Sequence, residues 1–229
     1  MKILSLSCLI LLISSCNISA NKKSLVKGIE QTPKLTKEQL SNADSLDIKF
    51  QIRGFCYAYS SSKNKEKSGG EAHSDNLPKK VGSKFSKSGF YLLIDDKDLV
   101  ILDSTLLGCK LYLVNSSNSL VTFKAQDSRL DIIPEALNKK GEWKPIGYNP
   151  SSWCGNSYHT IKLDKNEYWE FEIPIFKGPY KTKMRYTLML TDSSSISSNE
   201  IDTYLNYEQF DSESKQGHTP CNIMDPYGE

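Results

Sequence analysis

Short alternations of apolar and polar residues run through most of the chain, beginning at Ile48. From Ile48 to Ala58 the even-numbered positions form one face of an extended chain and the odd-numbered positions form the other. The clearest alternations come later, over 161–173 and 180–190. A period of two is that of a β-strand with one buried face. Because helical periodicity is almost absent, the pattern predicts an all-β protein.

Turn-forming residues divide these alternations into short strands. Asp95-Asp96-Lys97-Asp98 predicts a turn between apolar runs at 90–95 and 99–103. Lys139-Lys140-Gly141-Glu142 predicts a hairpin turn that leads into a strand at 143–146. Other short strands are expected at 109–114, 121–123, 130–137 and 201–205. Many short strands at close spacing favour an antiparallel β-sandwich.

The strand order over 99–210 resembles that of an immunoglobulin-like sandwich. Gly178-Pro179-Tyr180 opens the longest alternating strand, and Tyr180 stands where the tyrosine corner of such a domain would be. The inter-sheet cysteine of antibody domains is missing from 181–190, so the resemblance does not extend to a true antibody domain. It implies a two-sheet sandwich over 99–210, with 46–98 as a strand extension.

Three stretches lack alternation. The segment 16–45 is polar and predicts a flexible tether, in which Thr36-Lys37-Glu38-Gln39 has the spacing of a capping box and indicates a short helix to about Asn42. The segment 60–88 is rich in lysine, serine and glycine and is expected to be a solvated insertion. The segment 211–229 is a polar tail.

The first sixteen residues have the form of a bacterial lipoprotein signal. A positive start at Lys2 precedes an apolar run from Ile3 to Ile13, which is too short to span a bilayer as a helix. The sequence Ile13-Ser14-Ser15-Cys16 resembles the lipobox, after which the signal peptide 1–15 is removed and Cys16 carries lipid. We therefore expect a membrane-anchored lipoprotein, acylated by groups such as palmitate.

The lipobox and the sandwich together resemble the envelope lipoproteins of Bacteroidota-type bacteria. Asp44-Ser45-Leu46 and Asp103-Ser104-Thr105 also fit the short O-glycosylation motif of such organisms. The resemblance implies a cell-envelope location, with the outer membrane, at its periplasmic face or cell surface, as the expected membrane. The membrane is then a partner through the lipid on Cys16.

Four further cysteines remain after signal cleavage, at Cys56, Cys109, Cys154 and Cys221. An even number of cysteines in an exported chain predicts disulfide bonds, and three connectivities are possible. Cys154 with Cys221 is slightly favoured because it would hold the tail. The spacing contains no Cys-x-x-Cys pair, so neither a zinc cage nor a dithiol redox motif is expected, and no metal or cofactor is predicted.

Charge and motifs argue against nucleic-acid binding and catalysis. The net charge is only +2 at pH 7, so a basic surface for nucleic acid is not expected. The sequence lacks Gly-x-Ser-x-Gly and His-Glu-x-x-His. Cys154 and His159 lie close enough in sequence for a thiol and a base, but a structural cysteine beside a strand is the simpler interpretation.

Recognition is the function that the sequence favours. Trp153 lies in a loop with Asn156 and Tyr158, and loops on a rigid sandwich commonly carry binding residues. Trp153 could instead fold inward as part of the core. We expect a non-catalytic binding module for an envelope protein or a glycan. The alternatives are a structural or assembly component without a separate ligand, and a glycan-processing enzyme.

Overall fold

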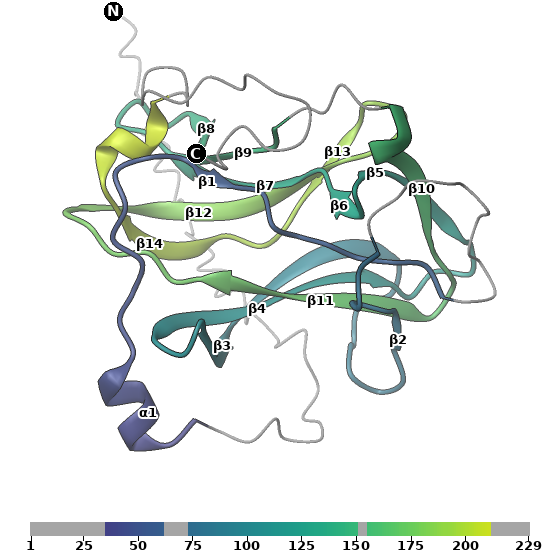
Figure 1. Ribbon diagram of the computed structural model, residues 1–229, viewed down its shortest axis with the longest axis horizontal. Helices are drawn as coiled ribbons and strands as arrows, with labels where there is room; N and C mark the ends of the chain where they lie inside the picture. Colours follow the sequence, from purple (N-terminus) through teal and green to yellow (C-terminus); the bar gives the residue numbers. More distant parts are fainter. Residues whose placement is uncertain (1–34, 62–72, 151–154, 212–229) are drawn as a thin grey trace, which may run out of the picture.

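The computed structural model describes residues 35–61, 73–150 and 155–211. Within these ranges the chain forms mainly antiparallel β-strands and one short α-helix, which confirms the predicted all-β sandwich class. Figure 1 shows two main layers, one containing β3, β4 and β11 and the other containing β7, β12 and β14.

The layers are formed by three antiparallel sheets and one parallel strand pair. The first sheet has the order β2 (Lys79–Lys80), β11 (Glu167–Pro174), β4 (Leu106–Asn115) and β3 (Phe90–Leu102). The second has the order β13 (Ser195–Ser197), β12 (Tyr180–Met189), β7 (Ile132–Leu137) and β8 (Trp143–Pro145), with β14 (Ile201–Leu205) also paired to β12. The third has the order β10 (Tyr158–Leu163), β5 (Val121–Gln126) and β6 (Arg129–Leu130), and β1 (Ile52–Arg53) pairs in parallel with β9 (Gly147–Tyr148).

The hydrophobic core fills the space between the layers. Trp169 of β11 is fully buried, as its parity predicted, and its indole Nε1 donates a hydrogen bond to the carbonyl of Tyr59 at 3.1 Å. From the opposite layer, Met184, Tyr186 and Leu188 of β12 enter the same cluster. The alternation predicted for β12 is therefore confirmed. Tyr180 does not form the expected corner, because its hydroxyl donates to Leu137 on neighbouring β7 at 3.1 Å.

The predicted short helix is also confirmed. α1 (Lys37–Asn42) begins after Thr36, whose hydroxyl accepts a hydrogen bond from the Gln39 backbone at 3.1 Å. The Gln39 side chain accepts in return from the Thr36 backbone at 2.9 Å, which completes the capping box. Among the described residues, no helix is both long and apolar enough to cross a membrane.

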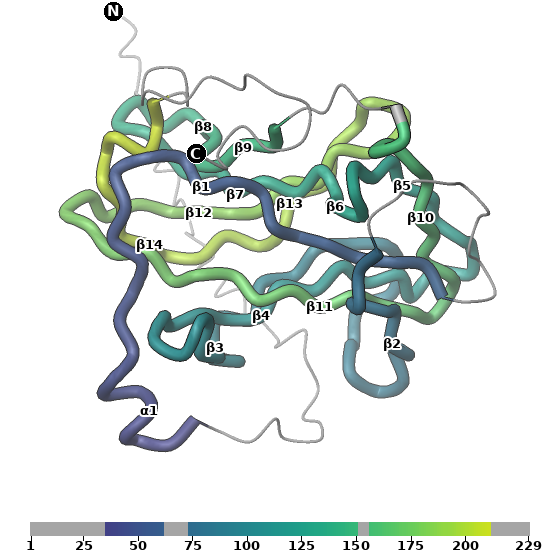
Figure 2. Tube along the Cα trace, in the orientation of Figure 1, coloured from purple at the N-terminus to yellow at the C-terminus, as the bar shows by residue number. Residues whose placement is uncertain are grey.

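The segment 44–60 follows the edge of the sandwich instead of forming the long strand that its alternation predicted. Figure 2 shows it rising from α1 and then crossing the molecule toward β2 and β10. Its backbone bonds to a different neighbour at each step: Leu46 to Ile175, Ile52 to Ile146 and Ala58 to Ser128. Because these partners lie in different parts of the chain, no continuous ladder forms, and within this segment only β1 is a strand. The prediction of a long strand was wrong for this reason.

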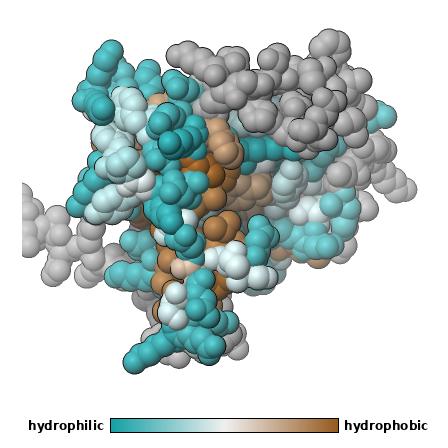
Figure 3. All heavy atoms as spheres, turned by 60° about the vertical axis from the view of Figure 1, so that its left-hand side comes forward, coloured by the Kyte–Doolittle hydropathy of each residue, from teal (hydrophilic) through white to brown (hydrophobic). Residues whose placement is uncertain are grey.

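This crossing segment closes part of the core, and its outer side carries apolar surface. Leu46 and Ile48 pack against the core, while Phe50 is 47% exposed. Figure 3 views the side of the molecule where α1 and the start of the segment lie, and it shows a band of apolar side chains between polar ones.

Two other predictions needed correction. The turn expected at 95–98 does not exist, because β3 continues through it with a bulge between Asp95 and Leu99. The second half of the insertion, 73–88, is not merely a solvated loop. Val81 and Phe85 are buried there against Tyr112 and Tyr168, in a second cluster on the outer face of the first sheet.

Candidate functional site

One hollow on the described surface, which we call the Glu170 groove, has a volume of about 640 Å³. It lies where the crossing segment and the segment 74–79 meet the free edge of β11. Its lining combines aromatic, aliphatic, amide and charged groups: Phe55, Tyr57, Ser74, Asp75, Asn76, Leu77, Pro78, Lys79, Lys110, Glu170, Phe171 and Glu172. A volume of this size is within the range of known ligand pockets.

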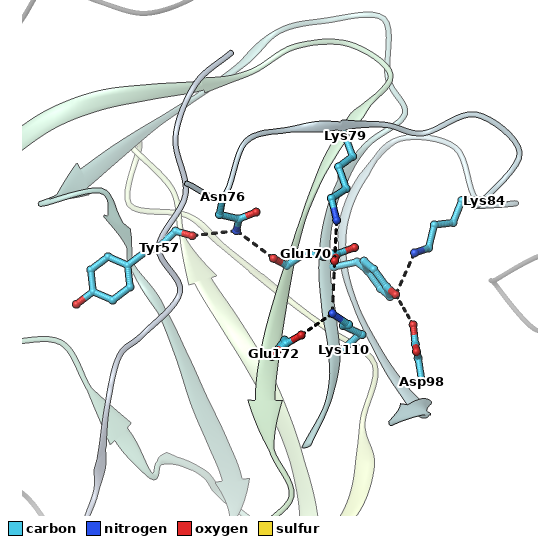
Figure 4. A network of polar contacts seen from close by, with 9 residues as sticks. Tyr57, Asn76, Lys79, Lys84, Asp98, Lys110, Glu170 and Glu172 are labelled. Atoms are coloured by element: carbon cyan, nitrogen blue, oxygen red, sulfur yellow. Dashed lines mark hydrogen bonds and ion pairs between the residues drawn. The ribbon is translucent and has the colours of Figure 1, made fainter. Parts of the chain in front are cut away.

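A network of paired charges forms one side of the Glu170 groove (Figure 4). Lys110, only 8% exposed, projects from β4 between two glutamates of β11. Its ammonium lies 2.7 Å from the Glu172 carboxylate and 3.4 Å from that of Glu170. Lys79 reaches Glu170 from the other side at 2.7 Å. Residues 110, 170 and 172 are brought together because they occupy the same face of adjacent strands.

These contacts fix the charged forms of the network. Burial alone would raise the pKa of Glu170, but the bond from Lys79 and the charge of Lys110 outweigh it and lower this pKa. Burial alone would lower the pKa of Lys110, but its contacts with Glu172 and Glu170 raise it. Glu170 and Lys110 are therefore both charged at neutral pH, and neither is suited to exchange a proton there.

The β3 bulge and the segment 79–88 extend this polar surface. Tyr112 of β4 donates a hydrogen bond to Asp98, which lies in the bulge, at 2.7 Å. Lys84 in turn donates to the Tyr112 hydroxyl at 3.1 Å, and its ammonium lies 4.4 Å from the centre of that ring. The sequence pattern identified Asp98 only as a turn residue, so its role here was missed.

One stretch of the β11 edge is left open to the Glu170 groove. On this edge β2 pairs only with Glu167 and Tyr168, and the Asn76 amide then donates to the Glu170 carbonyl at 3.0 Å. The next backbone contact is made after the strand, where Leu46 bridges Phe176. Strand alternation turns the N–H and C=O of Glu172 to the same edge as those of Glu170. Within the described ranges, no hydrogen bond reaches these two backbone groups of Glu172 on that side.

Apolar side chains form the remaining walls of the Glu170 groove. Leu77 is 49% exposed, and Phe55 is half-buried beside it in the lining. Asn76 fixes the distance across the groove, since its amide also donates to the Tyr57 carbonyl at 2.9 Å. In Figure 4 the ring of Tyr57 points away from the lysine–glutamate network. The groove thus offers apolar walls, fixed charges and an open strand edge together.

A smaller hollow, the Arg129 groove, has a volume of about 350 Å³. It is lined by Lys124, Ala125, Gln126, Arg129, Leu130, Asp131, Asn149, Pro150 and Tyr158. Tyr158, one of the predicted binding residues, is 51% exposed here. Asn156 is exposed on the short 3₁₀ turn η2 (Gly155–Ser157) and does not line the groove. Trp153 lies outside the described residues, so the prediction made for it stays a prediction.

Arg129 is placed by a tight hairpin between β5 and β6. Asp127 and Ser128 have φ of 49° and 65°, the left-handed conformation of a two-residue type I′ turn. The turn sets Arg129 opposite Gln126, whose side-chain oxygen accepts its Nη2 at 2.6 Å. The same nitrogen donates to the Pro150 carbonyl at 2.7 Å. The turn was missed because its second residue is serine in place of the usual glycine.

The cysteine predictions are partly overturned. Cys56 and Cys109 are free thiols buried in the core, so neither belongs to a disulfide. Burial raises the pKa of Cys109 to about 12 and that of Cys56 still further, so both remain protonated and unreactive. Cys16, Cys154 and Cys221 lie outside the described residues.

His159, which the sequence offered as a base, and the outer face of β12 both have structural contacts. His159 lies 3.4 Å from the Ser128 hydroxyl and 3.4 Å from the Ser157 carbonyl at the start of β10. On the outer face of β12, Arg185 pairs with Glu135 at 2.9 Å and lies 4.2 Å from the centre of the Trp143 ring. Arg185 is therefore held by an ion pair and an aromatic ring on this face.

Comparison with known proteins gives no match: no protein-family model, no curated protein and no solved structure matches the chain. A function has therefore to be inferred from the geometry of the two grooves.

Proposed function

We propose that this protein is a non-catalytic envelope lipoprotein whose β-sandwich captures an extended segment of a partner protein in the Glu170 groove. The observation that carries the proposal is the open edge of β11, at the floor of a groove with apolar walls. An unpaired edge presents backbone donors and acceptors to any chain that can lie beside it. A bound chain would pair with the same edge of β11 that β2 occupies at Glu167 and Tyr168.

In this kind of recognition, backbone contacts supply most of the affinity and side-chain contacts supply the specificity. Main-chain hydrogen bonds to Glu172 would hold the added chain, and these bonds are independent of its sequence. Alternate side chains of the ligand would then point toward Phe55 and Leu77 or toward the charged face. The exposed part of Glu172, whose side chain is 45% exposed, and the half-exposed Lys79 would select among ligands by charge.

The state of the charged network favours binding over catalysis. Three carboxylates line the groove, and Glu170 and Glu172 are the two that share one strand face, where an acid–base enzyme such as a glycoside hydrolase could use a pair. Both are ion-paired with Lys110, and the lowered pKa of Glu170 removes the proton that a general acid would need. A glycan-processing activity is therefore the weaker proposal.

The anchor belongs to the same proposal. Lipid on Cys16 would hold the sandwich at the outer membrane, at about 0.8 kcal/mol for each buried methylene. The segment between Cys16 and α1 would then act as a tether. A purely structural role in the envelope, the alternative from the sequence, would not require the groove to bind a separate chain.

The decisive test removes one backbone donor. Glu172→Pro deletes the N–H that faces the groove, and proline is tolerated on an edge strand when that N–H is not used within the sheet. Glu172→Gln is the matched control, because it alters the same side chain but keeps the N–H. The full-length chain would be screened against an array of extended peptides. We expect binding that survives in Glu172→Gln and is lost in Glu172→Pro.

Thermal unfolding of both variants verifies that the sandwich is intact. If the two variants bind the selected peptides equally well, strand addition is wrong. If the wild-type chain binds no peptide on the array, the proposed class of ligand is wrong.

A further inference from the structure

Arg129 is a buried cation without a carboxylate of its own. It is 4% exposed, and its hydrogen bonds, with the Gln126 side-chain oxygen, the Pro150 carbonyl and the Tyr57 side chain, are with neutral groups. Over 35–61, 73–150 and 155–211, no acidic side chain forms an ion pair with it. A buried charge is costly to leave without a counter-charge, so an anion in the Arg129 groove would supply what the protein does not.

The charges around the Arg129 groove also favour an anion. Lys124 lies exposed on β5 in the lining of the groove. Burial lowers the pKa of Arg129, and the nearby positive charge of Arg53 lowers it further. Asp131 is the one acid in the lining, and its carboxylate accepts a hydrogen bond from Asn149 at 2.7 Å. Asp127 lies outside the lining and acts on Arg129 only through its charge. The lining therefore carries a net positive charge.

An exposed aromatic ring completes the groove. Tyr158 stands directly across from Gln126 in the β10–β5 ladder. The face of a pyranose ring packs on such aromatic surfaces, while amide groups such as those of Gln126 and Asn149 match hydroxyls. A volume of about 350 Å³ is near the lower end of ligand sites, which suits one sugar unit better than a folded surface.

We infer that the Arg129 groove is a second binding site, one that takes the carboxylate of an acidic sugar. The Arg129 guanidinium supplies a buried positive charge opposite the carboxylate, Lys124 adds a second positive charge, and Tyr158 packs on the ring. The site is separate from the Glu170 groove and does not depend on the peptide-binding proposal, because none of its residues lines that groove.

The test titrates the full-length chain with trigalacturonate by calorimetry, beside two comparison ligands. The methyl ester of the same trisaccharide removes the charge, and a sulfated disaccharide replaces the carboxylate by another anion. We expect trigalacturonate to bind at least about tenfold more tightly than its methyl ester. Equal binding of the ester, or binding of the sulfated disaccharide alone, would overturn the assignment.

Variants of exposed residues locate the site without disturbing the buried arginine. Tyr158→Ala should weaken trigalacturonate binding about fivefold, whereas Tyr158→Phe, which keeps the ring, should bind nearly as the wild type does. Lys124→Gln should weaken binding by a similar factor, and Lys140→Gln, in the hairpin before β8, should not. If Tyr158→Ala and Lys124→Gln both bind like the wild type, the sugar is not bound in this groove.

Discussion

Lys110 is the side chain that joins the two glutamates of β11 on the outer face of the first sheet. It is almost fully buried and holds two glutamates that would otherwise repel each other across one face of β11. Lys79 supports only one of them, Glu170. Removing the Lys110 charge therefore leaves Glu172 without a counter-ion, which costs more than the loss of an ordinary surface pair.

Lys110→Met should lower the free energy of unfolding by about 1–3 kcal/mol, a range reduced because its partners are partly exposed. Lys97→Met, an exposed lysine in the β3 bulge, should change it by less than about 0.5 kcal/mol. Urea unfolding at neutral pH measures both. Equal effects of the two substitutions would mean that the network contributes nothing to stability.

The same network predicts a pH dependence. The pKa of Glu170 is lower in the folded protein than its usual value of 4.5, so its contribution is present above that value and is lost as the pH falls through the folded pKa. Because Lys110 contributes to this lowering, Lys110→Met should lose less stability than the wild type between neutral pH and acid. If the unfolding free energies of the two proteins fall equally between neutral pH and acid, this prediction is wrong.

At the residue scale, the sequence could predict which side chains are exposed but not which ones meet. Tyr158 was predicted as a binding residue from its loop, and it lies on a groove. The parity of β11 places Glu170 and Glu172 on the outer face. That Lys110 stands between them depends on the register of β4 against β11, which local pattern does not determine.

Among the elements, two hairpins turn through residues that rarely adopt the conformation required. The β3–β4 turn has Asp103 at φ 45° and Ser104 at φ 68°, and the β5–β6 turn has the same Asp-Ser pair. A left-handed conformation costs a residue with a Cβ about 1–2 kcal/mol, a cost that glycine avoids. Asp-Gly would be the usual sequence for such a turn.

Ser104→Gly should therefore raise the unfolding free energy by about 0.5–1 kcal/mol, after the greater entropy of glycine in the unfolded chain is deducted. Gly89→Ala tests the opposite case, because Gly89 has φ 103° and alanine there should destabilise by at least about 1 kcal/mol. Differential scanning calorimetry measures whether each substitution raises or lowers the melting temperature. A lower melting temperature for Ser104→Gly would show that its side chain is needed.

Most strands after β3 could be predicted because their alternation matches a buried inner face, as in β12. The predictions failed where tertiary contacts replaced a local rule. The acidic run 95–98 is polar enough for a turn, yet it bulges within β3 because β4 continues to pair on both sides of it. The segment 48–58 alternates like a strand, yet it lacks a single neighbour with which to pair.

For the molecule as a whole, the segment 73–88 is the main difference from the predicted organisation. Its composition is that of a solvated loop, but Phe85 packs between Tyr112 and Tyr168, with ring centres 5.3 Å and 5.1 Å apart. The first sheet is thereby covered on both faces along part of its length. Three apolar residues in a polar stretch, Leu77, Val81 and Phe85, are too few to form a recognisable periodic pattern.

Phe85→Ala should consequently lower the unfolding free energy by about 3 kcal/mol. Leu77→Ala is the matched control from the same segment. Because Leu77 is 49% exposed, its truncation should cost less than about 1 kcal/mol. Chemical denaturation compares the two. A small loss for Phe85→Ala would mean that the second cluster is dispensable.

The crossing segment has a consequence for the two grooves. Tyr57 contributes its carbonyl to the Asn76 clamp on the Glu170 groove, and it bridges Arg129 of the other groove through its backbone. Tyr57 thus lines the Glu170 groove and contacts Arg129, which lines the other groove. A ligand that displaces Tyr57 would change the free energy of binding in the Arg129 groove, and thermodynamic linkage would require the effect to be equal in both directions. Under the two proposals together, binding of a peptide in one groove would change the affinity of the other groove for an acidic sugar, and the reverse.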